Sequence, residues 1–276
     1  MNNVNDSRVQ RYENGHLTMA EEHLAAECMI QIIVNDALVT TLLGSPEDVE
    51  ELVAGHLMTE HAVDVQSITD IHVNNEGGAL QAYASLRDGL TLTPRPSIVT
   101  SSCGACDQTN LPDLIAGTPT VESLGTEVDM EHVLDALRSM RENQPSFEQT
   151  GGVHAAGLYF GREQSLLVCE DIGRHNAVDK VLGRHALSRL ERPQALLLSG
   201  RCGWDIVAKA ARAAIPIVAS FGAASSLAAQ TARSCNITLL SFVKGNKAVV
   251  IGPVDGRFKR KPVSYTHLRA HETGYN

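Results

Sequence analysis

The sequence predicts an α/β protein in which a smaller α+β domain precedes a three-layer α/β/α domain. From Thr150 to Ile251, short apolar runs alternate with stretches of helical period, and the links between them are short. This alternation favours right-handed crossovers and a largely parallel sheet covered by helices on both faces. Before Thr150 the chain instead shows two pairs of strand-like runs around one amphipathic helix, which is typical of an α+β unit.

The composition divides the chain into four segments. We predict a disordered lead-in over 1–22, the N-terminal α+β domain over 23–125, the C-terminal α/β/α domain over 126–253 and a tail over 254–276. The lead-in is polar. Within the tail, residues 263–276 have no apolar period and resemble translated adaptor read-through, so this tail is expected to be partly non-native.

The N-terminal domain opens with a hairpin signal. Cys28–Val34 and Ala37–Leu43 are apolar and β-branched, with an Asn-Asp turn between them. Ser45 is the expected N-cap of the following helix, with Pro46 at its first position. His56 falls on the apolar face of that helix, where a buried core histidine is a better interpretation than a ligand.

The remaining elements follow from period and capping. Ile68–Val73 and Leu80–Leu86 are predicted strands, and Asp129 is expected to cap a helix that ends before Pro145. The C-terminal domain is predicted to contain strands at Val153–Phe160, Leu166–Cys169, Ala195–Leu198, Ile217–Ala219, Ile237–Val243 and Ala248–Ile251, and helices at Ala177–Arg189, Trp204–Ala214 and Ser225–Ser234.

Charge and hydropathy exclude several classes of function. The formal net charge is −9, which disfavours non-specific binding of nucleic acid or a membrane surface. No apolar run reaches the ~18 residues of a membrane span. The first residues lack the apolar core of a secretory signal. We therefore expect a cytoplasmic protein whose six cysteines are reduced rather than paired.

The first candidate site is a C-x-x-C pair. Cys103 and Cys106 stand in a small-residue loop, Thr100-Ser101-Ser102-Cys103-Gly104-Ala105-Cys106. Two thiols at this spacing can form a disulfide, supply half of a metal site, or activate one another as thiolates. Two buried or structural cysteines are the alternative without chemistry, because one pair alone is a weak signal.

The second candidate site gathers at the ends of strands in the C-terminal domain. Gly173, Arg174 and His175 follow one predicted strand, and Gly200 and Arg201 follow another. Ligands of open sheets bind outside the carboxyl ends of strands, where helix N-termini offer free N–H groups to phosphates. We therefore predict an anion or nucleotide-phosphate cradle.

Two further residues belong to this prediction, and one alternative remains open. His154 lies in a third stretch, Thr150-Gly151-Gly152-Val153-His154-Ala155-Ala156, and Lys180 was expected to add a charge-assisted contact. The alternative is that these residues are helix caps and salt bridges. Neither the P-loop nor the G-x-G-x-x-G fingerprint occurs, and a second C-x-x-C that would close a zinc site is missing from the sequence. No protein-bound metal is predicted.

Four of these stretches together resemble the FdhD-type sulfur carriers, which are formate dehydrogenase accessory proteins. In chain order they are Ser102–Cys106, Thr150–Ala156, Glu170-Asp171-Ile172-Gly173-Arg174-His175-Asn176-Ala177-Val178-Asp179-Lys180 and Ser199-Gly200-Arg201. The resemblance runs from about Val34 to about Lys247. It implies a cytidine-deaminase-like C-terminal fold without the zinc.

The resemblance also implies a function. A cysteine desulfurase would load a persulfide on Cys103, assisted by Cys106. The carrier, expected to be a homodimer, would pass the sulfur to bis(molybdopterin guanine dinucleotide) molybdenum cofactor before its insertion into formate dehydrogenase. By the same resemblance, the cofactor-binding segment is Phe242, Val243, Lys244, Gly245, Asn246 and Lys247. Two other functions remain open: a dithiol redox or metal-binding enzyme, and a non-catalytic cofactor-binding chaperone.

Overall fold

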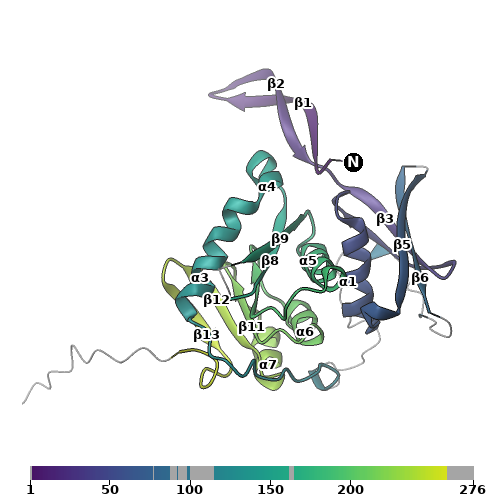
Figure 1. The fold of residues 1–276 in the computed structure, drawn as a ribbon. Coiled ribbons are helices and arrows are strands. Elements are labelled where there is room, and N and C mark those ends of the chain that lie inside the picture. Colours follow the sequence, from purple (N-terminus) through teal and green to yellow (C-terminus); the bar gives the residue numbers. More distant parts are fainter. Residues whose placement is uncertain are drawn as a thin grey trace, which may run out of the picture.

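The structure is a computed structural model that describes residues 2–76, 78–87, 92, 98–99, 115–161 and 165–259. Its strands form a two-stranded ribbon, a five-stranded sheet and a six-stranded sheet (Figure 1). The mixed α/β architecture agrees with the predicted fold class. Cys103, Cys106 and the residues 260–276 lie outside the described part of the chain.

The ribbon corrects the prediction of a disordered lead-in. Strands β1 (Val4–Glu13) and β2 (His16–Ala25) pair antiparallel along their whole length and stand away from the body of the protein (Figure 1). Asn14 and Gly15 join them at φ angles of 51° and 87°. Asn-Gly is a strong signal for a two-residue hairpin turn, and the sequence analysis passed over it because the flanking residues are mostly polar.

The five-stranded sheet forms the N-terminal domain. Its order is β5-β6-β3-β4-β7, and the helix α1 packs on one face. The elements are β3 (Cys28–Val34), β4 (Ala37–Gly44), α1 (Val49–His61), the short η1 (Val65–Ser67), β5 (Ile68–Glu76), β6 (Ala79–Leu86) and β7 (Ile98–Val99). The predicted hairpin and strand pair are confirmed.

The start of α1 differs from the prediction. The helix begins at Val49 after Asp48, which has φ 56°, so Ser45 is not its N-cap. The Ser45 hydroxyl instead accepts a hydrogen bond from the backbone N–H of Ile172, 3.0 Å away, in the other domain. His56 is buried in α1, as expected, and its Nδ1 lies 3.7 Å from the Asp179 carboxylate.

The six-stranded sheet has the order β13-β12-β11-β10-β8-β9. Only the β10–β11 and β11–β12 pairs are parallel, so the sheet is mixed rather than largely parallel. The short links between β8 and β9, and between β12 and β13, cannot hold a crossover and therefore form antiparallel hairpins. The strands are β8 (His154–Tyr159), β9 (Leu166–Asp171), β10 (Ala195–Leu198), β11 (Ile217–Ser220), β12 (Thr238–Lys244) and β13 (Lys247–Ile251).

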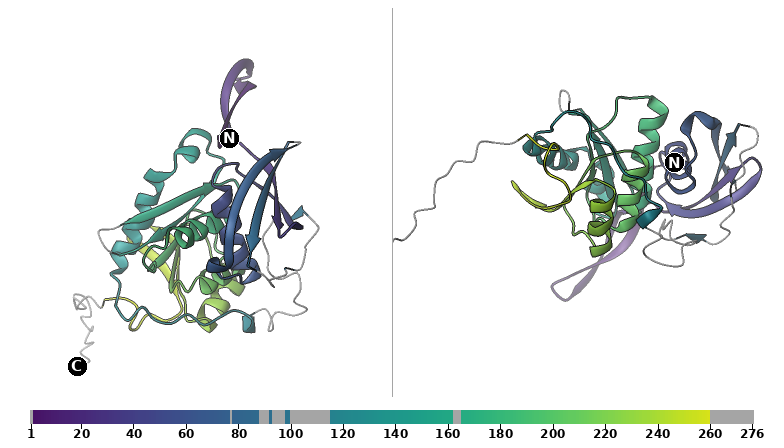
Figure 2. Two further views of the ribbon diagram at one scale, coloured as in Figure 1. Left: turned by 45° about the vertical axis from the view of Figure 1, so that its right-hand side comes forward. Right: turned by 90° about the horizontal axis from the view of Figure 1, so that it is seen from below.

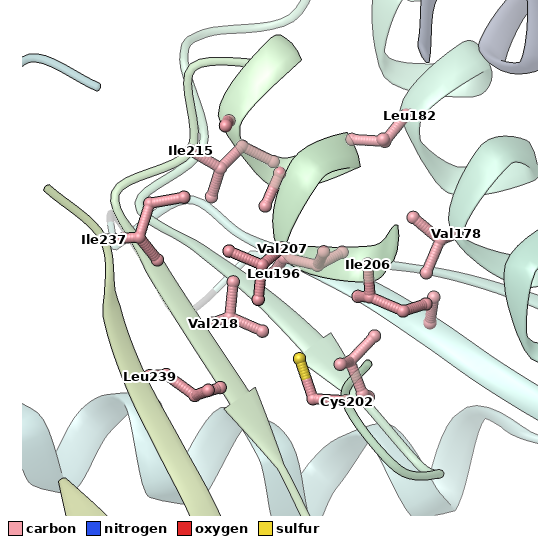
Figure 3. Packing of buried hydrophobic residues seen from close by; sticks show 14 of the residues in the cluster. Val178, Leu182, Leu196, Cys202, Ile206, Val207, Ile215, Val218, Ile237 and Leu239 are labelled. Carbon is pink, nitrogen blue, oxygen red and sulfur yellow. The ribbon is translucent and has the colours of Figure 1, made fainter. Parts of the chain in front are cut away.

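Helices cover both faces of this sheet. The core on one side contains side chains of α5, α6 and α7, shown in part in Figure 3, and the core on the other side contains those of α3. The elements are α3 (Met130–Ser139), the short η2 (Met140–Asn143), α4 (Pro145–Thr150), α5 (Arg174–Ser188), α6 (Trp204–Arg212) and α7 (Ser226–Ser234). The Asp129 side chain caps α3, as predicted.

The folded part of the C-terminal domain continues past residue 253. Phe258, which was assigned to the tail, is buried in the core beside α3. The backbone N–H of Val128 donates to the carbonyl of Arg257 at 3.0 Å, and Lys259 donates back to Val128.

The two domains meet where α1 packs against α5 (Figure 2). Glycines allow this close approach: a Cβ on Gly55 would lie 1.9 Å from the carbonyl oxygen of Asp179, and one on Gly183 would lie 1.9 Å from that of Glu51. Such contacts are impossible for a larger residue without moving a helix. Within the described residues, no helix is long and apolar enough to cross a membrane.

Candidate functional site

The predicted strand-end residues gather at one edge of the six-stranded sheet. β9, β10, β11 and β12 end at this carboxyl edge, and the antiparallel β8 begins there. A Cβ on Gly200 would lie 3.0 Å from Nδ1 of His154, and one on Gly222 would lie 2.6 Å from the carbonyl oxygen of Gly200. The N–H of Phe242 donates to the Gly222 carbonyl at 3.0 Å. A continuous surface therefore joins His154 to Phe242.

Two helices begin at this edge. α5 starts at Arg174, three residues earlier than the predicted start at Ala177, so Arg174 and His175 both lie in its first turn. Gly173 precedes α5 and Gly203 precedes α6, and neither helix has a side-chain N-cap. In α6 the N–H of Ile206 donates to Asp205 Oδ1 at 3.0 Å, so this donor is taken. The other N–H groups of an uncapped helix N-terminus and its positive dipole end are available to an anion.

The first turns of α5 and α6 are tied together by charge. His175, only 5% exposed, forms an ion pair with Asp205, and Arg174 Nη2 lies 4.0 Å from the same carboxylate. Burial by itself would raise the pKa of Asp205. The hydrogen bond and charge of His175 outweigh burial, helped by the backbone N–H of Ile206 and then by the charge of Arg174, and the pKa falls below its ordinary value. Asp205 is therefore ionised at neutral pH.

His154 is half-buried among cations. Burial is the main cause that lowers the pKa of its imidazole, and the charge of Arg174 is the next. His175 and Arg201 lower this pKa further. A neutral imidazole is therefore expected at pH 7, which can both accept and donate a hydrogen bond beside the cations.

The predicted cofactor segment 242–247 forms the end of β12 and the turn into β13. Phe242 has φ 52° and is 58% exposed, at a register irregularity between Ser241 and Lys244. Val243 is buried in the core beside α3, so only its backbone can face a ligand. The other four residues are exposed; they are Lys244, Gly245, Asn246 and Lys247.

The segment 242–247 is held in place by helix α3, which covers one face of the six-stranded sheet. Arg138, on α3, donates to the carbonyl of Gly245 at 2.8 Å. The turn is therefore held in place while its lysines point to solvent. It lies on the same edge as Gly200, separated from it by the Gly222 loop.

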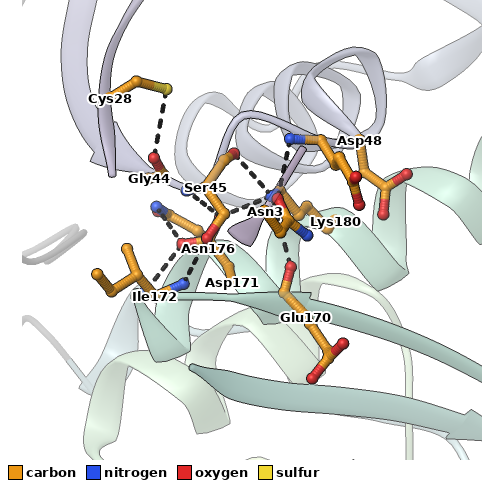
Figure 4. Close-up of polar contacts among 12 residues, drawn as sticks. Asn3, Cys28, Gly44, Ser45, Asp48, Glu170, Asp171, Ile172, Asn176 and Lys180 are labelled. Carbon is orange, nitrogen blue, oxygen red and sulfur yellow. Dashed lines mark hydrogen bonds and ion pairs between the residues drawn. The ribbon is translucent and has the colours of Figure 1, made fainter. Parts of the chain in front are cut away.

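Part of the Glu170–Lys180 motif has a structural role that the sequence analysis did not separate from binding (Figure 4). Lys180 is fully buried, with Nζ 2.6 Å from Asp171 Oδ2 and 3.1 Å from the Ser45 carbonyl oxygen. It is therefore unavailable to a ligand, contrary to the prediction. Asn176 donates to the carbonyl of Leu43 at 2.8 Å. These contacts attach the end of β4 to the start of α5.

Glu170 caps a neighbouring helix. Its carboxylate accepts hydrogen bonds from the backbone N–H groups of Ser146 and Phe147, each at 2.8 Å, at the start of α4. The alternative interpretation as caps and salt bridges thus holds for Glu170, Asp171 and Lys180. Arg174, Arg201 and His154 remain at the open edge.

The sequence analysis missed Asp205 and Trp204. Trp204 is buried, and its indole N–H has no hydrogen-bond partner. Both residues stand at the start of α6, three and four residues after Arg201. The carboxylate of Asp205, so soon after the strand-end Gly200, could have indicated that it belongs to this edge. Among the described residues, no group of three or more histidine, cysteine or acidic side chains could hold a metal ion.

Comparison with known proteins adds an independent finding. The model of the FdhD/NarQ family matches residues 25–253. The chain is 35% identical over 211 residues to the sulfur carrier protein FdhD of Picrophilus torridus, covering 76% of this chain and 80% of that protein. It is 38% identical over 203 residues to FdhD of Thermoplasma acidophilum, covering 71% of each.

A solved structure has the same fold. The crystal structure of a candidate formate dehydrogenase accessory protein from Desulfotalea psychrophila superposes with a TM-score of 0.74 at 24% identity. The match covers 92% of this chain and 99% of that one. The arrangement of both domains is therefore similar in the two proteins.

Proposed function

The chain belongs to the FdhD/NarQ family, and from this membership we propose that it is a sulfur carrier required for formate dehydrogenase activity. In this proposal Cys103 carries the sulfur as a persulfide and Cys106 assists. A cysteine desulfurase is the donor. The acceptor is the molybdenum cofactor, a bis(molybdopterin guanine dinucleotide), before its insertion into formate dehydrogenase. We expect the carrier to act as a homodimer in the cytoplasm, where thiols stay reduced.

The loading step is a thiol–persulfide exchange. The Cys103 thiolate attacks the terminal sulfur of the desulfurase persulfide and forms a new S–S bond. The S–S bond of the donor breaks, and the donor cysteine leaves as a thiolate. No oxidant or reductant is needed, because the sulfane sulfur moves between two cysteines of equal oxidation state.

The observation that carries the proposal is the state of the other four cysteines. Burial raises the pKa of the Cys28, Cys202 and Cys235 thiols, and it raises the pKa of Cys169 to about 12. Thiolates are the nucleophiles, so these four are poor carriers. Cys103 and Cys106 are the remaining cysteines of the chain.

The position of β7 supports the proposal that the Cys103 thiol acts at the proposed cofactor surface. β7 pairs in parallel with β4 at Thr41 and Leu42, and the residues that follow Leu42 are bonded to the start of α5. Cys103 comes four residues after Val99, and four residues span at most about 14 Å. The described end of β7 therefore lies beside the strand that is bonded to α5, and Cys103 follows it four residues later in the sequence.

The carboxyl edge has the chemistry that a large anionic cofactor needs. The pyrophosphate groups of the cofactor are dianionic. The carboxyl edge offers them Arg174 and Arg201, which lie beside two helix N-termini without side-chain caps. Asp205 neutralises mainly His175, which it contacts directly, while Arg174 is 4.0 Å away. Gly173, Gly200, His154 and the segment 242–247 complete the proposed cofactor surface. The residues present therefore fit the cofactor.

The test is intact-mass analysis after incubation with a cysteine desulfurase and cysteine. The expected product is heavier by about 32 Da, one sulfur atom, and peptide mapping assigns the sulfur to Cys103. Cys235→Ala is the matched control and should load fully. A reversible disulfide without added sulfur would support a dithiol redox enzyme instead, and formate dehydrogenase that matures with Cys103→Ala would support a cofactor-binding chaperone.

A further inference from the structure

Two arginines are fixed at the opposite, amino edge of the six-stranded sheet. Arg192, Ala214 and Asn236 directly precede the parallel strands β10, β11 and β12. Arg192 donates through Nε and Nη2 to the carbonyl oxygen of Ala214, at 3.2 and 2.7 Å. Its Nη2 also donates to the carbonyl of Glu122 at 3.1 Å. The guanidinium is therefore held by main-chain acceptors on two loops.

Arg257 reaches the same place from the C-terminal segment. Its Nη2 donates to the carbonyl oxygen of Asn236 at 2.6 Å. Asn236 in turn donates through its side chain to the carbonyl of Val121, 2.7 Å away, and Val121 adjoins Glu122. A short chain of hydrogen bonds thus connects Arg257 to the anchor of Arg192.

Among the described residues, no carboxylate compensates the charge of this pair. No ion pair joins Arg192 or Arg257 to a carboxylate anywhere in the described residues. Arg257 is only 3% exposed, and its Nη1 is buried without a hydrogen-bond partner. Burial lowers the pKa of Arg257, and the charge of Arg192 lowers it further. A buried guanidinium with an unmet donor beside a second cation is costly unless an anion completes it.

We infer that this amino edge holds a binding site for a tetrahedral oxyanion, either inorganic phosphate or the phosphoryl group of a larger ligand, between Arg192 and Arg257. The main-chain anchors occupy Nε and Nη2 of Arg192 and Nη2 of Arg257, and they hold both guanidiniums in place before binding. Nη1 of each arginine is left to donate a charge-assisted hydrogen bond to such oxygens. The site is separated from the carboxyl edge by the full length of the strands. It is therefore independent of the proposed cofactor surface.

The experiment measures binding of sodium phosphate by titration calorimetry at constant ionic strength set with chloride. Phosphate can also bind the carboxyl edge, so the reference protein carries Arg174→Ala and Arg201→Ala. Adding Arg192→Gln should weaken phosphate binding by at least ~10-fold, because a charge-assisted contact is lost. Arg257→Lys, which keeps the charge but loses the Nη1 donor, should also weaken it.

The matched control is Arg189→Gln, which removes an exposed arginine at the end of α5. It should leave phosphate affinity unchanged. A parallel titration with AMP distinguishes the source: tighter binding of AMP than of phosphate indicates a nucleotide ligand, and the reverse indicates the free anion. Absence of phosphate binding in the reference protein, or equal affinity with and without Arg192, would overturn the inference. Far-UV circular dichroism confirms that each variant is folded.

Discussion

Lys209→Met should strongly destabilise the junction of α1, α5 and α6. Lys209 is fully buried, and its Nζ lies 2.8 and 2.9 Å from the two carboxylate oxygens of Asp179. The same ammonium lies 2.6 Å from Glu60 and 2.9 Å from Thr59 Oγ1. Methionine fills a similar volume but leaves two buried carboxylates without their shared cation. Breaking a buried pair in this way costs about 3–5 kcal/mol of unfolding free energy.

The depressed pKa of Asp179 gives the pH dependence of this interaction. Burial alone would raise this pKa, but Lys209 and then His56 lower it from 3.8 to about 2. A carboxyl group whose pKa is lowered on folding stabilises the folded state at neutral pH. Because the folded pKa is depressed, this contribution is complete above pH 4 and is lost as pH falls toward 2.

The assay is guanidinium denaturation followed by the fluorescence of Trp204, the only tryptophan in the chain, which stands at the start of α6. The variant should lose about 3–5 kcal/mol at pH 7. Its deficit should shrink at pH 5, because carboxylates that lack a cation have raised pKa values and bind protons on folding. Lys247→Met, on an exposed lysine, is the control. A cost below about 1 kcal/mol at pH 7, or a deficit independent of pH, would refute this reasoning.

Three further predictions concern function and the chain end. Cys103→Ala should abolish support of formate dehydrogenase and Cys235→Ala should not; equal loss in complementation assays would indicate a folding defect. Deletion of 263–276 should leave the melting temperature unchanged, and a large drop would contradict the assignment of a non-native tail. Arg174→Ala and Arg201→Ala should each weaken binding of GDP, a cofactor fragment, by roughly tenfold to a hundredfold in calorimetry. Unchanged affinity in both would remove this edge as the cofactor surface.

Local patterns were sufficient for most elements of the C-terminal domain. The short runs at Ala195–Leu198 and Ile217–Ser220 are mostly apolar and completely buried, and such runs predict strands without tertiary information. The apolar pattern alone did not predict whether neighbouring strands pair parallel or antiparallel. The apolar period is the same for parallel and antiparallel strands, so the β8–β9 and β12–β13 pairings depended on the shortness of their links.

The sequence predicted the place of the candidate site in the fold but not the role of each of its residues. Gly173 and Gly200 follow strands, which places them at the carboxyl edge from topology alone. The sequence could not show which cation of the motif is structural and which lies at the open edge, because Lys180 and Arg174 carry the same charge. The difference arises from partners distant in the chain: Lys180 meets Ser45, 135 residues away, whereas Arg174 is partly exposed beside Asp205.

Helix α5 connects these observations. Its first turn carries Arg174 and His175 at the open edge, its second turn carries Asp179 and Lys180, and Gly183 allows the contact with α1. Asp179 and Lys180 are bonded to the N-terminal domain from the two sides of one helix. The N-terminal domain and the carboxyl edge are therefore fixed to the same rigid element. In the proposed function, the distance from Val99 to Arg174 is then set by packing, and delivery of sulfur depends on the three residues between Val99 and Cys103.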